Sequence, residues 1–328
     1  MPTFAAIDVG TNTVRLLVAE ADAPGAYAVQ HQAQAITRLG EGLEATGHLT
    51  AAAIGRTVGV VAEYAATSRR LGAVASRAVA TSAAREAVNR EAFLTAATAA
   101  GCPVEVVSPA EEARLTTLGA LHLLPHSSAR CVIIDIGGGS TEFTLAAGGA
   151  PQGSVSLPLG VVKLTERFLP EDPPPAEALA ALAAHVRRAL TGVPFQRELR
   201  SAEAIGTAGT VTTLAALELR LDPYDPHRVT GHRLTLERVR ELSAWLAGMP
   251  LTERQHLPGL EPGRADVIVA GAYLLAEALA VLGFEALTVT DGGLREGILL
   301  DTLIRHLAPH GPAADGVRSA PSGPSLAP

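Results

Sequence analysis

Two short segments of this sequence place one aspartate beside glycine and hydroxyl residues, a combination suited to phosphate chemistry. The first runs over residues 6–13 (AIDVGTNT) and the second over residues 134–141 (IDIGGGST). In each segment an apolar run leads to the aspartate, a turn containing glycine and hydroxyl residues follows, and a second apolar run begins. We therefore predict a strand, a tight turn and a returning strand in both places.

The turns themselves have the composition of an anion-binding site. Glycine lets the backbone come close to a bound anion, and successive N–H groups of such a turn form a concave binding surface. Asp8 and Asp135 stand near the ends of the two predicted strands, where a carboxylate can hold a metal ion or water against a phosphate. One such turn alone would be read as an ordinary hairpin. Two of them at matching places in the two halves, with a third glycine-rich turn at residues 206–210 (GTAGT), favour a binding site. The duplication predicts two similar domains that face one cleft.

The composition is that of a globular protein large enough for two domains. The chain has 328 residues, of which 48% are hydrophobic and 18% are charged. No apolar run approaches the roughly 20 residues needed to span a bilayer. The first residues (MPTFAAID) pass directly into a predicted strand, without a basic region or a cleavage site. We therefore expect a cytoplasmic protein without a membrane partner.

The net charge and the number of histidines and cysteines limit the kinds of ligand that the protein can bind. The net charge of −7 and an isoelectric point near 5.8 argue against a protein that coats nucleic acid. A polyanionic ligand would need a local basic cleft, to which Arg15, Lys163 and Arg264 are candidate contributors. The ten histidines show no paired ligand spacing, and two cysteines are too few for a zinc site or a disulfide framework. The carboxylate and hydroxyl groups of the turns suit Mg²⁺ or Mn²⁺ instead.

Strands and helices alternate along the chain, as expected of an α/β fold. After the first hairpin and around the second, we predict strands at residues 28–37, 74–81, 104–107, 154–157, 203–205 and 286–290. Helices are predicted at residues 161–168, 176–190, 235–247, 263–282 and 294–306, and from Pro109 and Val211 onward. Thr50 is the predicted cap of a long helix ending near Arg70, and Ser82 and Asn89 are cap candidates for two short ones.

Neither of the two common nucleotide-binding loops is present. No glycine turn ends in Gly-Lys-Ser/Thr, as a P-loop requires. The dinucleotide-binding fingerprint also fails, because Glu142 stands where glycine is required and the turn leads into a strand. Both of the corresponding folds are therefore disfavoured.

Four further motifs accompany the two turns along the chain: ATSAAR at residues 80–85, SPAEEAR at 108–114, GTAGT at 206–210 and DGGLREG at 291–297. With them, the sequence resembles the exopolyphosphatase and guanosine pentaphosphate phosphohydrolase (Ppx/GppA) family, a branch of the actin, Hsp70 and sugar kinase superfamily. The resemblance covers about residues 4–305. The DxGxN pattern alone indicates only the superfamily, whereas GGGSTE together with EEAR and TSAAR is specific.

The resemblance implies a fold of two actin-like, ribonuclease H-like α/β domains that face an interdomain cleft. The first domain would comprise residues 1–113 and 294–308, and the second residues 114–293. Residues 309–328 are mostly Pro, Gly, Ser and Ala and are predicted to form a disordered tail.

The resemblance also implies an activity, the Mg²⁺-assisted hydrolysis of a terminal phosphoanhydride bond. The substrate would be inorganic polyphosphate, with release of orthophosphate, or guanosine pentaphosphate, and the sequence does not decide between them. Glu112 would be the base that activates water, and Arg85 would neutralise charge on the phosphate, while Asp135 and Glu142 would position metal or water. The phosphate-binding residues would be Gly10, Thr11, Asn12, Thr13, Gly137, Gly138, Gly139, Ser140, Gly206 and Thr207. The metal ligands would be Asp8, Asp135 and Glu142.

Other interpretations stay open at this point. An ATP-dependent kinase of the same superfamily, or an ATP-binding protein like actin or Hsp70, would carry similar turns. Apart from the resemblance, Glu112 would be read as a helix-start charge favoured by the helix dipole, and Arg85 as a surface arginine. A homodimer is left open. Longer family members have an additional C-terminal helical portion that extends polyphosphate binding and is not part of this sequence, so processivity on long chains is open too.

Overall fold

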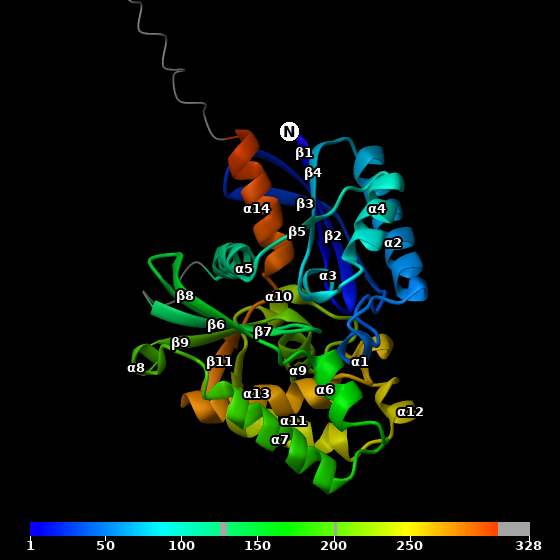
Figure 1. The fold of residues 1–328 in the computed structure, drawn as a ribbon. Coiled ribbons are helices and arrows are strands. Elements are labelled where there is room, and N and C mark those ends of the chain that lie inside the picture. The colour runs from blue at the N-terminus through cyan, green and yellow to red at the C-terminus, as the bar shows by residue number, and fades with distance from the viewer. Residues whose placement is uncertain (125–129, 200–201, 308–328) are drawn as a thin grey trace, which may run out of the picture.

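The computed structural model describes residues 1–124, 130–199 and 202–307, which form two α/β units stacked one above the other (Figure 1). Each unit is built on one mixed sheet. The first sheet has five strands in the order β3-β2-β1-β4-β5, and the second has six in the order β10-β11-β9-β6-β7-β8. The predicted tail at residues 309–328 lies outside the described residues.

The first sheet contains both strands of the first predicted hairpin. Its strands are β1 (Thr3–Val9), β2 (Thr13–Ala23), β3 (Ala26–Ile36), β4 (Ala73–Ala80) and β5 (Glu105–Val106). β1 is central, and all of its seven residues are buried, because helices cover both faces of the sheet. β2 and β3 follow it as an antiparallel meander, whereas β4 is parallel to β1.

The second sheet repeats this arrangement. Its strands are β6 (Arg130–Ile136), β7 (Thr141–Ala147), β8 (Ala150–Leu157), β9 (Glu203–Thr207), β10 (Arg233–Thr235) and β11 (Ala286–Val289). β6, β7 and β8 form the meander, β9 is parallel to β6, and β11 is parallel to β9. β10 is an added antiparallel edge strand, which was not predicted. The predicted duplication and the actin-like α/β class are confirmed by this repeated strand order.

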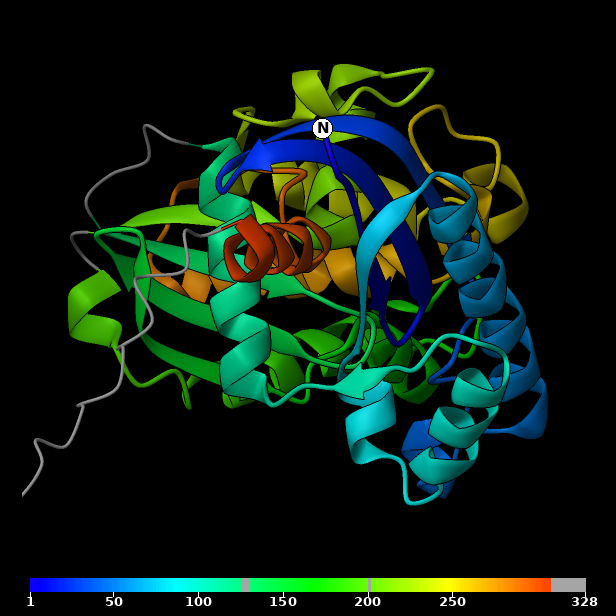
Figure 2. The ribbon, with the colours of Figure 1, turned by 90° about the horizontal axis from the view of Figure 1, so that it is seen from above.

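Helices form layers on the two sheets. On the first sheet, α2 (Ala51–Arg70) and α4 (Arg90–Ala99) cover one face, while α5 (Pro109–Leu123) and α14 (Leu294–Leu307) cover the other (Figure 2). The large core of the second unit is built from α6 (Val161–Phe168), α7 (Ala176–Leu190), α9 (Ala208–Leu219), α11 (Leu236–Ala247) and α13 (Ile268–Leu282). Short helices are α1 (Leu43–Thr46), α3 (Ser82–Glu86), α8 (Gln196–Leu199), α10 (Pro226–Val229) and α12 (Leu251–Arg254), with a 3₁₀ turn at Pro262–Arg264.

Helix α5 belongs to both units. Leu115 packs into the apolar cluster beneath the first sheet, and Ala120, a little over one turn later, packs against Cys131 and Ile133 of the second sheet. The proposed domain boundary after residue 113 falls inside this helix. α5 is therefore a shared wall between the two units.

Most predicted elements are confirmed, and the differences have local causes. Thr50 caps α2, since its side chain accepts a hydrogen bond from the Ala53 N–H. Ser82 is the first residue of α3 rather than its cap, and Asn89 precedes α4 without a capping bond. The Asn89 amide instead bonds both backbone polar groups of Leu49, a contact over 40 residues that local patterns cannot reveal.

The predicted helix over residues 263–282 is shorter in the structure. A 3₁₀ turn at Pro262–Arg264 precedes α13, which begins only at Ile268. Cys102 and Cys131 are buried free thiols. None of the helices in the described part of the chain combines the length and hydropathy required to cross a lipid bilayer.

Candidate active site

The two duplicated turns have the same backbone geometry and lie against each other. In the first, the Gly10 N–H donates to the Thr13 carbonyl at 3.0 Å, and in the second the Gly137 N–H donates to the Ser140 carbonyl at 3.0 Å. A Cβ on Gly138 would lie 3.1 Å from Cβ of Thr11. Glycine is therefore needed in the second turn because the two turns approach so closely.

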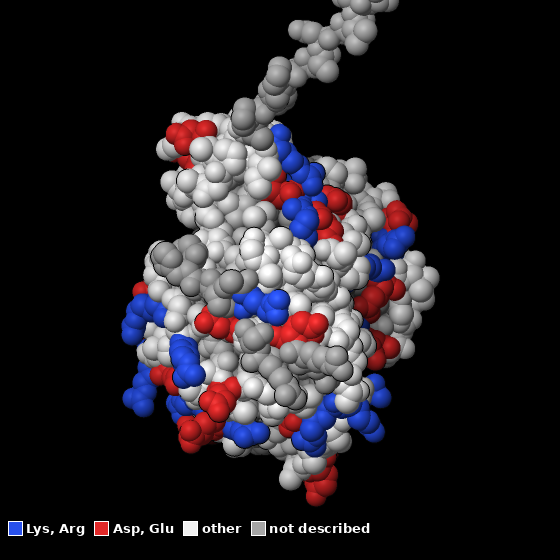
Figure 3. All heavy atoms as spheres, turned by 90° about the vertical axis from the view of Figure 1, so that its left-hand side faces the viewer, with Lys and Arg blue, Asp and Glu red and all other residues white. Residues whose placement is uncertain are grey.

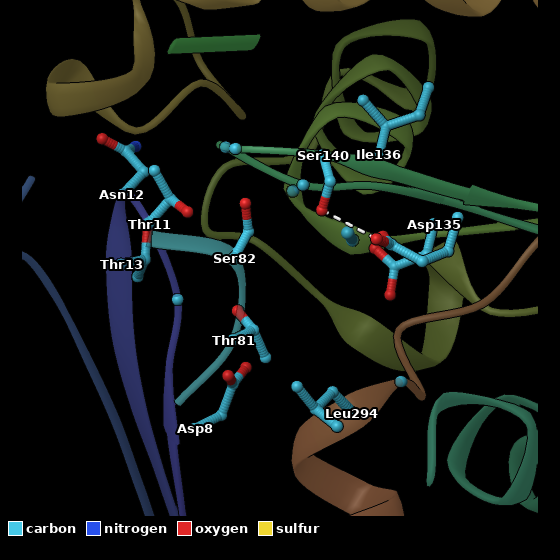
Figure 4. A pocket seen from close by; sticks show the side chains of 18 of the residues that line it. Asp8, Thr11, Asn12, Thr13, Thr81, Ser82, Asp135, Ile136, Ser140 and Leu294 are labelled. Atoms are coloured by element: carbon cyan, nitrogen blue, oxygen red, sulfur yellow. Dashed lines mark hydrogen bonds between the residues drawn. The ribbon is translucent and has the colours of Figure 1, made fainter. Parts of the chain in front are cut away.

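These turns form the floor of a narrow cleft between the two units, with a volume of about 100 Å³. Figure 4 shows Asp8 and Asp135 on opposite sides of this cleft, with Thr81 and Ser82 on the same side as Asp8 and the first turn. The predicted residues that line the cleft are Asp8, Gly10, Thr11, Asn12, Thr13, Glu112, Asp135, Gly137, Gly138, Gly139, Ser140, Glu142 and Thr207. The structure thus brings together side chains separated by up to about 200 positions in the sequence.

The cleft offers backbone donors to an anion. Within the described residues, the N–H groups of Thr11, Asn12, Gly138 and Gly139 donate to no protein acceptor. Helix α9 also directs its N-terminus toward the cleft, where residues 208–210 line the wall. Free N–H groups and the positive end of a helix dipole both favour bound phosphate.

Two aspartates that line this cleft have raised pKa values. Burial raises the pKa of Asp8 from 3.8 to about 6, although the nearby Arg15 opposes the rise. Burial and the neighbouring Glu142 raise the pKa of Asp135 from 3.8 to about 7, again opposed by Arg15. Carboxylates crowded in this way gain stability from a cation placed between them.

Glu112 reaches the cleft from the first turn of α5. Ser108 caps that helix by accepting a hydrogen bond from the Glu111 N–H at 3.2 Å, which starts the helix with Glu112 on its buried side. Oε2 of Glu112 accepts a hydrogen bond from Nη1 of Arg85 at 2.8 Å. Burial, reinforced by the charge of Glu142, raises the pKa of Glu112 well above its ordinary value, and Arg85 acts in the opposite direction. A buried carboxyl with a raised pKa is suited to accept a proton in a reaction near neutral pH.

Glu142 is held more firmly than the other carboxylates. Its Oε1 accepts hydrogen bonds from the hydroxyls of Ser140 at 2.7 Å and Ser156 at 2.6 Å. The strand register explains this, because Glu142 lies opposite Ser156 in the β7–β8 pair and opposite Asp135 in the β6–β7 pair. Burial raises its pKa, and the two serine hydroxyls lower it.

The donor set can be compared with what Mg²⁺ requires. Among the described residues, no group of three or more His, Cys, Asp or Glu side chains is placed to bind one cation. Mg²⁺ is usually bound by one or two carboxylates, with substrate phosphate oxygens and water completing its octahedron. Asp8 and Asp135 fit that requirement, and Oδ1 of Asn12 is a further buried oxygen without a hydrogen-bond partner in the described part of the chain. Glu142, whose Oε1 is already shared by two hydroxyls, fits it less well.

Four residues that the sequence analysis assigned to the site do not line the first cleft: Gly206, Arg85, Lys163 and Arg264. Gly206 is in β9, below the cleft, where a Cβ would lie 2.8 Å from Val211 and 2.9 Å from Leu287, so its role is close packing. Residues 208–210 line the cleft instead. Arg85 meets Glu112 and the Val107 carbonyl rather than the cleft surface.

The two other basic candidates differ from each other. Lys163 is buried and forms an ion pair with Glu86 at 2.6 Å, so it does not line the cleft. Arg264 lies across the N-terminus of α9, where a Cβ on Gly209 would come within 1.4 Å of its Nη1. Glycine at position 209 therefore makes room for the Arg264 guanidinium.

A second and larger cavity of about 560 Å³ lies beside the first. Arg15 lines both cavities, and within the described residues it forms no hydrogen bond or ion pair. The second cavity is also lined by Gln32, Gln34, Tyr224, Arg264 and Arg295. Two of these arginines are paired with acids, Arg264 with Glu261 and Arg295 with Glu296.

The sequence interpretation gave Thr81 and Ser82 no role in the site, although both line the cleft. A signal was available, because both residues follow β4, the parallel neighbour of β1. The carboxyl ends of parallel neighbours meet at one edge of a sheet, where ligands of α/β proteins bind. The residues of the second cavity had no comparable local signal.

The duplicated sheets and the paired glycine turns define a phosphate-handling protein with the actin-like fold. A family model described as the Ppx/GppA phosphatase family matches residues 17–306, and the chain belongs to that family. Exopolyphosphatase 2 of Mycobacterium tuberculosis is 38% identical over 310 residues, which cover 90% of this chain and 97% of that protein.

Solved structures agree with this assignment. The Ppx/GppA family member of Aquifex aeolicus is 33% identical, with a TM-score of 0.76 over 93% of this chain and 98% of its own. An exopolyphosphatase from Cytophaga hutchinsonii is 26% identical, with a TM-score of 0.82 over 92% of this chain and 97% of its own. The resemblance stated from the sequence motifs is therefore confirmed.

Proposed function

We propose that this protein is an exopolyphosphatase, which hydrolyses the terminal phosphoanhydride bond of inorganic polyphosphate and releases orthophosphate. The observation that carries the proposal is the buried Glu112 at the edge of a cleft whose floor is made of two anion-binding turns. Family membership and relatives named exopolyphosphatase support the same substrate.

In the proposed reaction, the terminal phosphoryl group binds to the free N–H groups of the two turns and to the start of α9. Glu112 accepts the proton of the attacking water as the new P–O bond forms, and the shortened chain leaves with the electrons of the broken bond. Arg85 keeps the Glu112 carboxylate in place through their 2.8 Å hydrogen bond. Mg²⁺, held by Asp8 and Asp135, would neutralise charge on the phosphate oxygens when bound.

The second cavity is the proposed place for the rest of the substrate. Because Arg15 lines both cavities and is otherwise unpaired in the described residues, its guanidinium can bind a phosphate at their junction. A volume of about 560 Å³ also accepts a nucleoside, so guanosine pentaphosphate stays the second candidate substrate. A kinase or an ATP-binding protein without phosphatase activity is the alternative in a different class.

The direct test is a colorimetric orthophosphate assay with polyphosphates of several lengths, guanosine pentaphosphate and ATP. We expect phosphate release from polyphosphate, and the comparison with guanosine pentaphosphate decides between the two substrates. Binding of ATP without release of phosphate from any substrate would contradict the proposal and favour the alternative class.

The base is tested by Glu112→Gln, which keeps the shape of the side chain and removes its ability to accept the proton. We expect a fall in kcat of roughly 10²–10⁴-fold with little change in folding. Glu111→Gln is the matched control, because residue 111 points about 100° away around the helix and does not line the cleft. If Glu111 is essential and Glu112 dispensable, the role of base belongs to the neighbouring residue. If both are dispensable, the base lies elsewhere.

A cytoplasmic location and a homodimer stay predictions, and processivity stays open. The last of these has a simple measurement in the same assay. Product chains sampled at early times would be shortened evenly by a distributive enzyme, whereas a processive one would leave full-length and very short chains.

A further inference from the structure

Helix α5, which carries Glu112, crosses helix α14 at direct backbone contact (Figures 1 and 2). A Cβ on Gly297 of α14 would lie 1.8 Å from the carbonyl oxygen of Leu115 on α5. A Cβ on Gly119 of α5 would lie 2.0 Å from the carbonyl oxygen of Gly293. Glycine at these positions lets the two helices touch without side chains between them, so the middle of α5 is fixed against α14.

The N-terminal part of α5 is also attached to α14 through charged groups. Asp301 lies one turn after Gly297 on α14, and Oδ1 of Asp301 accepts a hydrogen bond from Nη2 of Arg114 at 2.6 Å. Arg114 follows Glu112 by two residues on α5. Arg114 lies in the second turn of α5, directly after the turn that carries the proposed base, so the Asp301–Arg114 pair joins this end of α5 to a second helix.

Asp301 has an exceptional number of partners for one carboxylate. Besides Arg114, it pairs with Arg77 of β4 at 2.7 Å and with Arg305 of its own helix at 2.7 Å. Its side chain is only 8% exposed. A carboxylate so enclosed holds its partners in fixed geometry, because charge-assisted hydrogen bonds in a partly dry setting are strong and directional.

Two other acids belong to the same group of charges but do not bridge α5 to α14. Glu111 pairs with Arg114 within α5 itself, at 2.8 Å. Glu105 of β5 pairs with Arg77 at 3.0 Å and is about half exposed. On the face of the molecule drawn in Figure 3, acidic and basic side chains likewise lie next to each other rather than in separate patches.

We propose that Asp301 is a positioning residue for the hydrolysis, which acts through Arg114 to hold the first turn of α5 and thereby the carboxylate of Glu112. Asp301 lines neither cavity, so it does not touch the substrate. The inference rests on the proposed function, because it requires Glu112 to be the base. It assigns a part in the hydrolysis to an ion pair between a buried aspartate and a half-buried arginine, which lie away from the cleft.

The test combines Asp301→Asn with Glu112→Gln in a double-mutant cycle on the full chain. A displacement of about 1 Å at a reacting group can cost on the order of 10²-fold. We therefore expect Asp301→Asn alone to lower kcat by roughly 10- to 100-fold, with KM within about twofold of wild type. In the Glu112→Gln background, Asp301→Asn is expected to cause no further loss, because the group that it positions is already absent.

Glu105→Gln and Glu111→Gln are the matched controls. Each removes one negative charge from the same group of ion pairs but leaves the Asp301–Arg114 bridge in place. We expect both to keep kcat within about twofold of wild type. Arg114→Lys serves as a second variant if Asp301→Asn fails to fold. Lysine keeps the positive charge but lacks the planar guanidinium whose Nη2 donates to Asp301. Arg114→Lys should therefore lower kcat with the same dependence on Glu112.

The outcomes distinguish a failure of the role proposed for Asp301 from a failure of Glu112 as the base. Equal losses for Asp301→Asn with and without Glu112, or losses for the controls as large as for Asp301→Asn, would assign Asp301 a purely structural role. A lower melting temperature with unchanged kcat would do the same. If Glu112→Gln itself keeps full turnover, the proposed base is wrong, and this result is visible before Asp301 is changed.

Discussion

Replacing Asp8 by asparagine is expected to stabilise the metal-free protein while it impairs the enzyme. The folded protein holds Asp8 buried, and its pKa rises from 3.8 to about 6. At 1.36 kcal/mol for each pKa unit, keeping this carboxylate ionised at pH 8 costs the folded state about 3 kcal/mol. An asparagine side chain at this position would have nearly the same shape and no charge to bury, so Asp8→Asn should recover most of this amount.

The dependence on pH follows from the direction of the change in pKa. Because the pKa of Asp8 is higher in the folded than in the unfolded state, the folded state binds more protons between about pH 4 and pH 6. The contribution of Asp8 to the free energy of unfolding is therefore fully retained at low pH and declines as the pH rises through that window. The gain from Asp8→Asn should be about 3 kcal/mol at pH 8 and less than about 1 kcal/mol at pH 4.

The assay is urea unfolding followed by circular dichroism in EDTA, which keeps divalent cations from binding to Asp8. Asp22→Asn, at an exposed position near the end of β2, is the matched control and should leave the free energy of unfolding unchanged at both pH values. Phosphate release measured with Mg²⁺ should fall in Asp8→Asn and stay at the wild-type level in Asp22→Asn. A variant that is less stable than wild type at pH 8, or equally stabilised at both pH values, would refute the reasoning.

Three further predictions concern the cleft. Turnover should require a divalent cation, because the donors are carboxylates and hydroxyls, and full activity in excess EDTA would contradict this. Arg85→Ala should raise the pKa of Glu112 further, since Arg85 lowers it, and the acid limb of the kcat profile should move to higher pH. An unchanged pH profile would mean that Arg85 does not act on Glu112. Substrate affinity should weaken as salt is added, because a chain of net charge −7 must attract a polyanion through local arginines. A KM independent of ionic strength would count against Arg15 and Arg264 as substrate contacts.

Much of the fold was predictable because its signals are local. The helices over residues 161–168 and 176–190 have the predicted limits, and the Thr50 cap depends only on a residue three positions away. The edge strand β10 escaped prediction because three residues carry too little periodicity. Asn89 occupies the predicted N-cap position of α4, but its side chain bonds Leu49, which is 40 residues away and outside the reach of local patterns.

The sequence by itself determined the two glycine turns. Gly10 and Gly137 close them by hydrogen bonds to residues three positions later, so the geometry depends only on a few consecutive residue types. The start of α5 at Ser108 is local in the same sense, and it places Glu112 on the buried side of the helix.

The tertiary structure alone decided what surrounds these groups. Arg85 pairs with Glu112 across 27 residues, Lys163 with Glu86 across 77, and Arg114 with Asp301 across 187. Each pair joins elements brought together by the order of strands and the crossing of helices, which no local pattern encodes. The raised pKa values of Asp8 and Asp135 have the same origin, because burial exists only when two distant halves of the chain close over both carboxylates.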